Sequence, residues 1–387
     1  MPQQPREEEQ YQVRYGGLHK RLFELILAEE KRSLGLFLIR LMAASIAWPY
    51  GRLVKVRNSL FDSRILKSQK LTCRVISVGN LTVGGTGKTP MVLWLARFLS
   101  EEGWRVAIVS RGYRRKHTGR LLVVSDGERI LADSYFSGDE PQLVARRLPG
   151  VPVLCSSKRV VAVEAAVRQF KSEVVILDDG FQHRYLDRDL DIVMLDAHHP
   201  FGNGRLFPRG LLREREVGLD RAQALVLARY DSGLQAQHNR EELTRNWPDK
   251  PIFPVKQRPV RLFHAVSEKE RPVGSLEKMR TAAFAGIAKP KTFFGSLVDL
   301  GARLVYASAL PDHHPLTDKL LRSLAKDAAA LDPEIWVITE KDWVRLPDVL
   351  PENMDLWVLS IELEFGVASS QFRGLVRKSL SEAVDFR

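Results

Sequence analysis

A glycine-rich run, residues 78–90, constrains the fold of this chain more than any other feature of its sequence. Residues 73–78 before it have the apolar composition of a buried parallel strand, and residues 91–99 after it repeat apolar side chains at helical spacing. In such a strand–turn–helix, backbone N–H groups and the positive end of the helix can surround the β- and γ-phosphates of a nucleotide. The sequence therefore predicts an α/β fold with a nucleoside triphosphate site at this turn.

The turn matches most of the P-loop pattern G-x-x-x-x-G-K-[ST], although Thr82 stands at the first glycine position. Lys88 is expected to contact the phosphates as a point charge, and the Thr89 hydroxyl is expected to hold Mg²⁺. A tight helix entry without a ligand is the alternative, and the strand–turn–helix context favours phosphate binding. The residues predicted to bind nucleotide are Gly84, Gly85, Thr86, Gly87, Lys88 and Thr89.

Beyond this turn the chain alternates between strand-like and helix-like segments. Such alternation predicts a P-loop NTPase-like parallel sheet with helices on both faces. Asp178 and Asp179 end an apolar strand, where a carboxylate would lie beside Mg²⁺ at the tip of a neighbouring strand. Capping of the next turn is the alternative role for these acids. Strands are expected at residues 105–110, 121–125, 153–155 and 174–177, and helices at 141–148 and 159–170.

The length of 387 residues exceeds what a single hydrophobic core usually supports. We expect an N-terminal tail with a basic, apolar helix over residues 1–70, a P-loop domain over 71–250, and a smaller α/β domain over 251–387. Cys73 and Cys155 are the only cysteines, so the sequence contains no disulfide framework and no cysteine zinc site. This cysteine usage fits a reducing compartment.

The positive charge is concentrated near an apolar run at residues 34–50, which Arg40 alone interrupts. Residues 31–70 carry nine Lys and Arg and a single acid. A soluble core helix is one interpretation, and a cleaved signal peptide is disfavoured because many acids precede the run. Trp48, Tyr50 and the basic flank favour contact with anionic membrane lipids. The helix would either lie on the cytoplasmic leaflet or cross the membrane with the P-loop in the cytoplasm.

The basic composition, with a net charge of +12, also raises nucleic-acid binding as a possibility. The excess positive charge lies beside an apolar run and not in loops where basic and aromatic residues alternate. No recognised nucleic-acid motif is present. We therefore expect no nucleic-acid partner, and the sequence indicates no obligate protein partner.

Two polar clusters have more than one interpretation. Asp139 precedes a helix, where it would be either the N-cap or a carboxylate that accepts a proton from an attacking hydroxyl. Asp312, His313 and His314 stand between two prolines. Two adjacent imidazoles seldom converge on one metal, so a loop histidine paired with an acid in catalysis or substrate binding is favoured.

An ordered set of motifs closely resembles the tetraacyldisaccharide 4′-kinase family, the inner-membrane enzymes that phosphorylate the lipid A disaccharide precursor. The resemblance extends from about Trp48 to the C-terminus, and the run Asp178–His183 beside this P-loop is its most specific part. It implies two α/β/α domains with the active site in a cleft, ATP and Mg²⁺ as cofactors, and an acylated disaccharide lipid as substrate. The other motifs are Arg57–Asp62, Ser110–Tyr113, Gly138–Pro141, Gly202–Leu206 leading to Leu212–Glu214, Ala285–Ala288, Asp312–His314 and Thr339–Asp342.

The resemblance also implies site residues. The catalytic carboxylate falls on Asp139, assisted by His313 with Asp312 beside it, and Lys88 neutralises charge during transfer. The positions that face Mg²⁺ and phosphate fall on Asp178 and Asp179. The residues expected to line the substrate cleft are Arg111, Tyr113, Arg159, Gln182, His183, Arg213 and Glu214.

Two other function classes use a P-loop. A regulatory or metallochaperone GTPase usually carries an [NT]-K-x-D element, and Thr339–Asp342 has these residue types in the wrong order. A membrane-tethered ATP-binding adaptor would leave Asp139 and the Asp312–His314 cluster without a role. Kinase activity on a lipid is the prediction that accounts for all of these residues.

Overall fold

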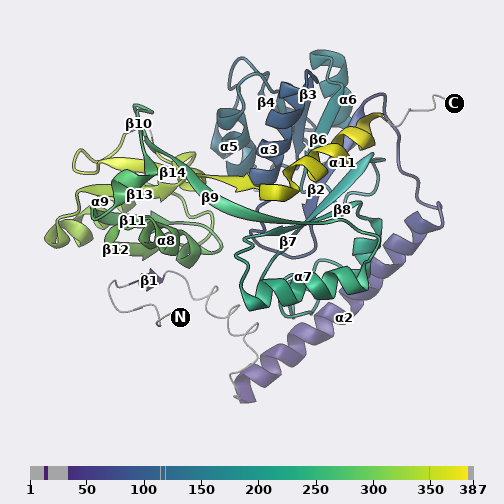
Figure 1. Cartoon of the computed structure of the whole chain (residues 1–387), viewed down its shortest axis with the longest axis horizontal. Coiled ribbons are helices and arrows are strands. Elements are labelled where there is room, and N and C mark those ends of the chain that lie inside the picture. The colour runs from purple at the N-terminus through teal and green to yellow at the C-terminus, as the bar shows by residue number, and fades with distance from the viewer. Residues whose placement is uncertain (1–12, 16–33, 114, 118, 348, 382–387) are drawn as a thin grey trace. The chain divides into compact units, whose positions relative to one another are not determined.

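The computed structural model describes residues 13–15, 34–113, 115–117, 119–347 and 349–381 (Figure 1). Contacts divide the chain into two units. The P-loop unit comprises Leu22–Gln257 and Leu363–Arg387, and the second unit comprises Met1–Arg21 and Arg258–Glu362. The chain therefore leaves the P-loop unit at Gln257 and returns to it at Leu363.

The P-loop unit contains a sheet whose strands are parallel except for one edge strand. β2 (Arg74–Asn80) lies in its middle, between β6 (Val174–Asp178) and β7 (Leu190–Asp196). The strand order is β9-β8-β7-β2-β6-β3-β5-β4. The remaining strands are β3 (Val106–Ser110), β4 (Leu122–Ser125), β5 (Val153–Cys155), β8 (Ala224–Ala228) and β9 (Ile252–His264).

Alternate residues of these strands form separate cores on the two faces of the sheet. Ile76 and Val78 join a core with α3, α5 and α11, whereas Val75 joins a core with α6. On the latter face, Val193 of β7 packs with α7. This confirms the predicted parallel sheet with helices on both faces (Figure 1). The helix bounds are α3 (Lys88–Glu101), α4 (Ser134–Ser137), α5 (Asp139–Arg147), α6 (Arg159–Phe170), η1 (Glu216–Arg221), α7 (Leu234–Asn246), η4 (Gly366–Ala368) and α11 (Ser369–Ser381).

The basic, apolar segment forms one helix, α2 (Leu34–Asp62), which continues through Pro49 (Figure 1). It is the one described helix with the length and composition to cross a membrane, and only 11% of its most apolar window is buried. Exposed apolar side chains dominate its first half, including Phe37, Leu41 and Met42. The second half contacts the rest of the P-loop unit, to which α2 belongs.

The second unit has a parallel sheet in the order β1-β12-β11-β13-β14. One core packs α8 against this sheet, with Phe294 completely buried. The strands are β1 (Val13–Tyr15), β10 (Glu270–Arg271), β11 (Arg280–Ala285), β12 (Arg303–Ala309), β13 (Ile335–Thr339) and β14 (Leu356–Glu364). The helices are η2 (Val273–Leu276), α8 (Pro290–Asp299), α9 (Asp318–Ala328), η3 (Ala329–Leu331) and α10 (Glu340–Trp343).

Candidate active site

The P-loop connects the carboxyl end of β2 to the first turn of α3. Gly84 and Gly87 have φ values of 115° and 85°, a region that a side chain makes unfavourable. A Cβ atom at Gly87 would also approach Gln257 Nε2 to 2.7 Å. Gly87 is the N-cap of α3, so Lys88 and Thr89 are its first helical residues. The backbone of this turn therefore has the form that phosphate binding at a helix N-terminus requires.

A hydrogen bond between buried polar side chains stabilises this turn. Asn80 ends β2, is completely buried, and donates from Nδ2 to Thr86 Oγ1 at 2.9 Å. The hydroxyl of Thr86 is thereby occupied within the protein, so the Thr86 side chain supports the loop. Its neighbour Thr89 is also buried, at the start of α3.

Asp178 lies at the end of β6, directly beside β2. Asp178 lies opposite Val78 of β2, and only 2% of Asp178 is exposed. Magnesium ions are commonly held by one or two carboxylates together with phosphate oxygens and water. A buried carboxylate and a threonine hydroxyl at the same edge fit this donor set, so Thr89 and Asp178 are suited to hold Mg²⁺.

Asp179 is in a cationic environment. Arg213 donates to both Asp179 carboxylate oxygens at 2.8 Å, and Lys88 Nζ lies 3.5 Å from Oδ1. Burial by itself raises the pKa of Asp179, but the charges of Lys88, Arg213 and Arg159 outweigh it and hold the pKa at about 2. Asp179 is therefore ionised at neutral pH and orients Lys88.

The three loops after β3, β5 and β6 bring the other predicted residues to the same edge of the sheet. Arg111 and Tyr113 follow β3, and both are exposed. Arg159 is the first residue of α6, which follows β5, and it is 4% exposed. Burial lowers the pKa of Arg159 to about 10, so this arginine stays cationic at neutral pH.

Gln182 and His183 continue the loop after β6. Gln182 Nε2 donates to the backbone oxygen of Asn80 at 2.8 Å, which ties this loop to β2. Burial lowers the pKa of His183 to about 4, and the positive charges of Arg159, Arg188 and Arg111 add to this effect. His183 is therefore a neutral imidazole at neutral pH.

Arg213 and Glu214 belong to a segment that pairs with the start of the P-loop. Arg213 N donates to Leu81 O, and Val83 N donates to Leu211 O, both at 2.7 Å. Glu214 is 1% exposed, and Arg221 donates to both of its carboxylate oxygens at 2.9 Å. This environment makes Glu214 a framework residue, while Arg213 reaches Asp179 directly.

Asp139 is the first helical residue of α5. The N-cap of this helix is Gly138, with φ of 90°. The interpretation of Asp139 as an N-cap is therefore wrong. A Cβ atom at Gly138 would approach the backbone oxygen of Tyr113 to 2.6 Å, so this glycine lets the start of α5 pack against the loop after β3.

Asp312 and His313 belong to the second unit, in the loop after β12. His313 has φ of 60°, and its Nε2 lies 3.8 Å from Asp312 Oδ1. His313 N donates to Gly286 O at 3.1 Å, so two of the recognised motifs meet here. Their action together with Asp139 stays a prediction.

The Thr339–Asp342 motif supports this histidine loop. Thr339 caps α10 with its side chain, and Asp342 is completely buried. Asp342 Oδ1 accepts from Gly286 N at 3.0 Å and from Arg345, which also donates to His314 O at 3.1 Å. Asp342 and Arg345 therefore hold Gly286, whose oxygen accepts from His313 N, and Arg345 also holds His314.

Known proteins match these motifs over most of the chain. The family model for tetraacyldisaccharide-1-P 4′-kinase (LpxK) covers residues 39–381. This chain belongs to the tetraacyldisaccharide 4′-kinase family. The tetraacyldisaccharide 4′-kinase of Desulfatibacillum aliphaticivorans is 37% identical over 339 residues, which are 86% of this chain and 90% of that protein.

Other members of the tetraacyldisaccharide 4′-kinase family agree in sequence and in structure. The tetraacyldisaccharide 4′-kinase of Syntrophus aciditrophicus (strain SB) is 41% identical over 321 residues, covering 80% of this chain and 85% of that protein. The crystal structure of LpxK from Aquifex aeolicus in complex with ATP has a TM-score of 0.70 and 32% identity. It covers 88% of this chain and 99% of that chain.

Two residues that lie at the P-loop were not identified from the sequence. Asp196 ends β7, and Arg229 follows β8 with φ of 61°. Arg229 pairs with Asp196 and donates to Gly85 O at 3.2 Å. An acid and an arginine after two apolar strands were the available signal, but their meeting depends on the order of strands in the sheet.

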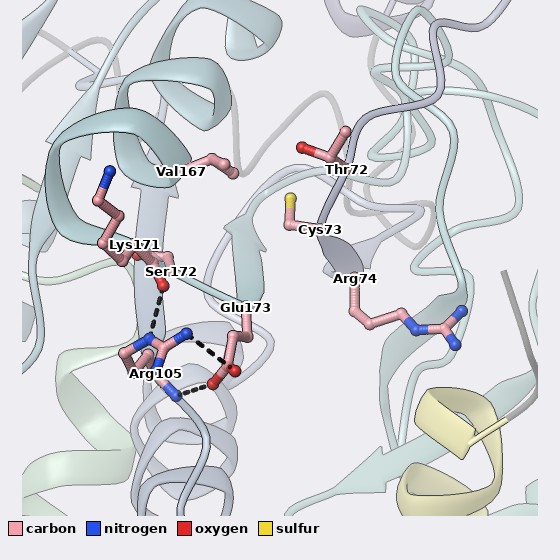
Figure 2. Close-up of a pocket in the computed structure, with 8 residues that line it drawn as sticks. All are labelled: Thr72, Cys73, Arg74, Arg105, Val167, Lys171, Ser172 and Glu173. Atoms are coloured by element: carbon pink, nitrogen blue, oxygen red, sulfur yellow. Dashed lines mark hydrogen bonds and ion pairs between the residues drawn. The ribbon is translucent and has the colours of Figure 1, made fainter. Parts of the chain in front are cut away.

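A cavity of about 380 Å³ lies at the opposite edge of the sheet, before β2, β3 and β6 (Figure 2). Figure 2 shows Arg105 joined to Glu173, at 3.0 Å, and to the backbone of Lys171. Burial raises the pKa of Cys73, another lining residue, to about 12, so its thiol stays protonated. The position of this cavity before the strands separates it from the kinase motifs.

Proposed function

We propose that this chain transfers the γ-phosphoryl group of ATP to the 4′-hydroxyl of a tetraacylated glucosamine disaccharide 1-phosphate. The product is the bis-phosphorylated lipid A precursor, lipid IVA. The family match over residues 39–381 carries this proposal, because it includes the P-loop, the paired aspartates and the second unit. ATP and Mg²⁺ are the cofactors.

At the phosphate end, the geometry of the P-loop unit supports the proposed roles. Backbone N–H groups from Gly84 to Gly87 would bind the β- and γ-phosphates, and Lys88 would neutralise the charge that develops during transfer. Thr89 and Asp178 would hold Mg²⁺, which when bound neutralises phosphate charge. Asp179, held between Lys88 and Arg213, would orient these two cations toward the phosphates.

At the acceptor end, Asp139 would act as the general base. The 4′-hydroxyl oxygen forms a bond to the γ-phosphorus, the bond from that phosphorus to the β-phosphate oxygen breaks, and the hydroxyl proton passes to Asp139. His313, with Asp312 beside it, would assist this step. The proposal for Asp139 is supported by its position directly after the N-cap Gly138, where the start of α5 packs against the loop after β3.

Substrate contacts are proposed for the loops at the carboxyl edge of the P-loop unit. Arg111 and Tyr113 are exposed on the loop after β3, where they would contact a bulky acylated sugar, whereas Arg159 offers a buried positive charge to phosphate. Gln182 and neutral His183 would contribute hydrogen-bonding groups. Glu214 would act by holding its neighbours and not by touching the lipid, since it is buried and paired with Arg221.

We further propose that α2 places the enzyme on the cytoplasmic face of the inner membrane. The exposed apolar half of α2 would enter the lipid, and the basic residues from Arg52 to Lys70 would contact anionic headgroups. Arg52 and Trp48 lie close together on the helix, with the guanidinium 4.9 Å from the ring centre. Such an aromatic–cation pair suits the interface between headgroups and acyl chains.

An assay of ATP consumption distinguishes this proposal from its two competitors. The full chain is incubated with Mg-ATP, with and without a detergent-dispersed tetraacyldisaccharide 1-phosphate. We expect ATP consumption that depends on the disaccharide and yields equal amounts of ADP and phosphorylated lipid. A switch GTPase would prefer GTP without lipid, and an adaptor would bind ATP without consuming it.

A further inference from the structure

Asn58, in the Arg57–Asp62 motif of α2, contacts the framework of the active site. Its Nδ2 donates to Glu214 Oε2 at 2.9 Å. Its Oδ1 accepts from Arg57 at 3.1 Å, and its backbone oxygen accepts from Arg184 at 3.0 Å. Arg184 also pairs with Asp62 at 2.7 Å, so the end of α2 is fixed to the loop after β6.

Glu214 connects Asn58 to the loop that carries Asp179. Besides accepting from Asn58 and Arg221, its Oε1 accepts from Gln182 Nε2 at 3.1 Å. These three donors come from α2, from η1 and from the loop after β6. A buried carboxylate with donors from three elements fixes the relative positions of those elements.

From Gln182 the contacts continue to the phosphate site. Gln182 Nε2 also donates to Asn80 O, and Gln182 Oε1 accepts from Arg213 at 3.4 Å. Arg213 binds Asp179, and Asp179 lies 3.5 Å from Lys88 Nζ. The polar groups from Asn58 to Lys88 are therefore linked by an unbroken series of contacts within the P-loop unit.

A second contact from α2 reaches the same segment. The Tyr50 hydroxyl donates to the backbone oxygen of Arg213 at 2.7 Å. Tyr50 and Asn58 thus hold adjacent residues, Arg213 by its backbone and Glu214 by its side chain. The second half of α2 is therefore connected to the active site by hydrogen bonds, whereas the first half is exposed and apolar.

We propose that Asn58 is a positioning residue for phosphoryl transfer. Through Glu214 it sets the position of Gln182 and Arg213, and through them the position of Asp179 and Lys88. The inference rests on the proposed roles of Lys88 and Asp179. Because small displacements of groups around a transferring phosphoryl reduce its rate, loss of this contact lowers kcat.

The test separates positioning from membrane attachment by measuring kcat and KM for the full chain. In Asn58→Ala we expect kcat to fall about tenfold, while KM for the dispersed disaccharide and binding to anionic vesicles change by less than roughly twofold. If α2 only attached the enzyme to lipid, Asn58→Ala would leave kcat unchanged and would change KM or vesicle binding instead. Ser59→Ala is the matched control, since Ser59 is the next residue and is exposed; its kinetics should equal wild type.

A pair of charge variants makes the test independent of folding losses. Asn58→Asp places a carboxylate against Glu214 and should reduce kcat further than Asn58→Ala. Adding Glu214→Gln restores one amide and one carboxylate across the contact, so the double variant should recover part of the kcat lost in Asn58→Asp. Thermal unfolding and the fraction of enzyme that binds Mg-ATP establish that each sample is folded.

The outcomes distinguish this inference from the roles on which it rests. A wild-type kcat in Asn58→Ala overturns the inference, and so does a double variant whose loss equals the product of the two single losses. If Asp179→Asn also leaves kcat unchanged, the proposed role of Asp179 is wrong. Loss of kcat in Asp179→Asn together with normal Asn58→Ala kinetics refutes only the role of Asn58.

Discussion

Lys88 is the residue from which we expect the largest side-chain contribution to nucleotide binding. Its ammonium lies 3.5 Å from Asp179 at the first turn of α3, where it adds charge to the helix N-terminus. We predict that Lys88→Ala removes most of the thermal stabilisation that saturating Mg-ATP gives the wild type. Lys326→Ala, on the exposed side of α9, is the control and should keep that stabilisation. Full stabilisation of Lys88→Ala would refute the P-loop assignment.

Asp139 tests the proposed general base. Since Gly138 is the N-cap, Asp139→Asn should leave the melting temperature near wild type. The same variant should lower kcat by roughly 10²–10⁴, the range for loss of a positioned base. Steady-state kinetics at a temperature where both proteins are folded provide the measurement. An Asp139→Asn enzyme with normal turnover would leave Asp178 or Asp179 as the candidate base.

The lowered pKa of His183 makes the free energy of unfolding depend on pH. Its pKa is about 4 in the folded protein, against about 6.5 in an unfolded chain, so unfolding takes up a proton between these values. The stabilisation is fully present above pH 6.5 and is lost as the pH falls toward 4. In His183→Gln, the urea midpoint should therefore fall less steeply between pH 6.5 and 5 than in wild type. Equal slopes in the two proteins would show that His183 is not held neutral.

The placement of residues next to a clear motif at one edge of the sheet was predictable. Lys88, Thr89, Asp178 and Asp179 follow apolar strands, and the carboxyl ends of parallel strands meet at one edge. The contacts of Asn58 with Glu214 and of Arg229 with the P-loop were not predictable, because these partners lie far along the chain. Asn58 and Glu214, for example, are separated by 156 positions.

At the scale of elements, the two halves of α2 have different surroundings. Its second half is held by Tyr50 and Asn58, and its first half exposes Phe37 and Leu41, with 60% and 56% of these residues accessible. We predict that Phe37→Ser with Leu41→Ser reduces flotation with anionic vesicles, because less apolar surface enters the lipid. The melting temperature should change little. The measurement is the bound fraction after centrifugation.

A matched pair elsewhere serves as the control for α2. Leu234 and Val367 are also apolar and highly exposed, and neither belongs to α2. Leu234→Ser with Val367→Ser should leave flotation at the wild-type level. Equal binding of the α2 variant and this control would mean that the first half of α2 does not enter the membrane.

The extent of α2 was only partly predictable. The apolar run at residues 34–50 and its basic flank were evident, but the residue at which the helix ends was not. The helix continues through Pro49 to Asp62. Contacts from Tyr50, Asn58 and Asp62 to distant segments stabilise this second half, and such contacts have no signature in local sequence.

At the scale of the whole molecule, the parallel sheet around the P-loop was predictable because strands and helices alternate in the sequence. Strands covered by helices on both faces are rich in apolar residues, and β8 is apolar throughout. The division into units was harder to predict. β9 and β14 each contain residues of both units, so no composition change marks the points where the chain crosses between them.

The central claim is direct phosphoryl transfer to the 4′-hydroxyl of an acylated disaccharide. Phosphorus NMR of the lipid recovered after incubation with Mg-ATP tests it most directly. We predict a second phosphomonoester resonance, coupled to the proton at the 4′ position, with the wild-type protein and not with Lys88→Ala. Release of inorganic phosphate with an unchanged lipid spectrum, or a new phosphate at another position, would contradict the claim.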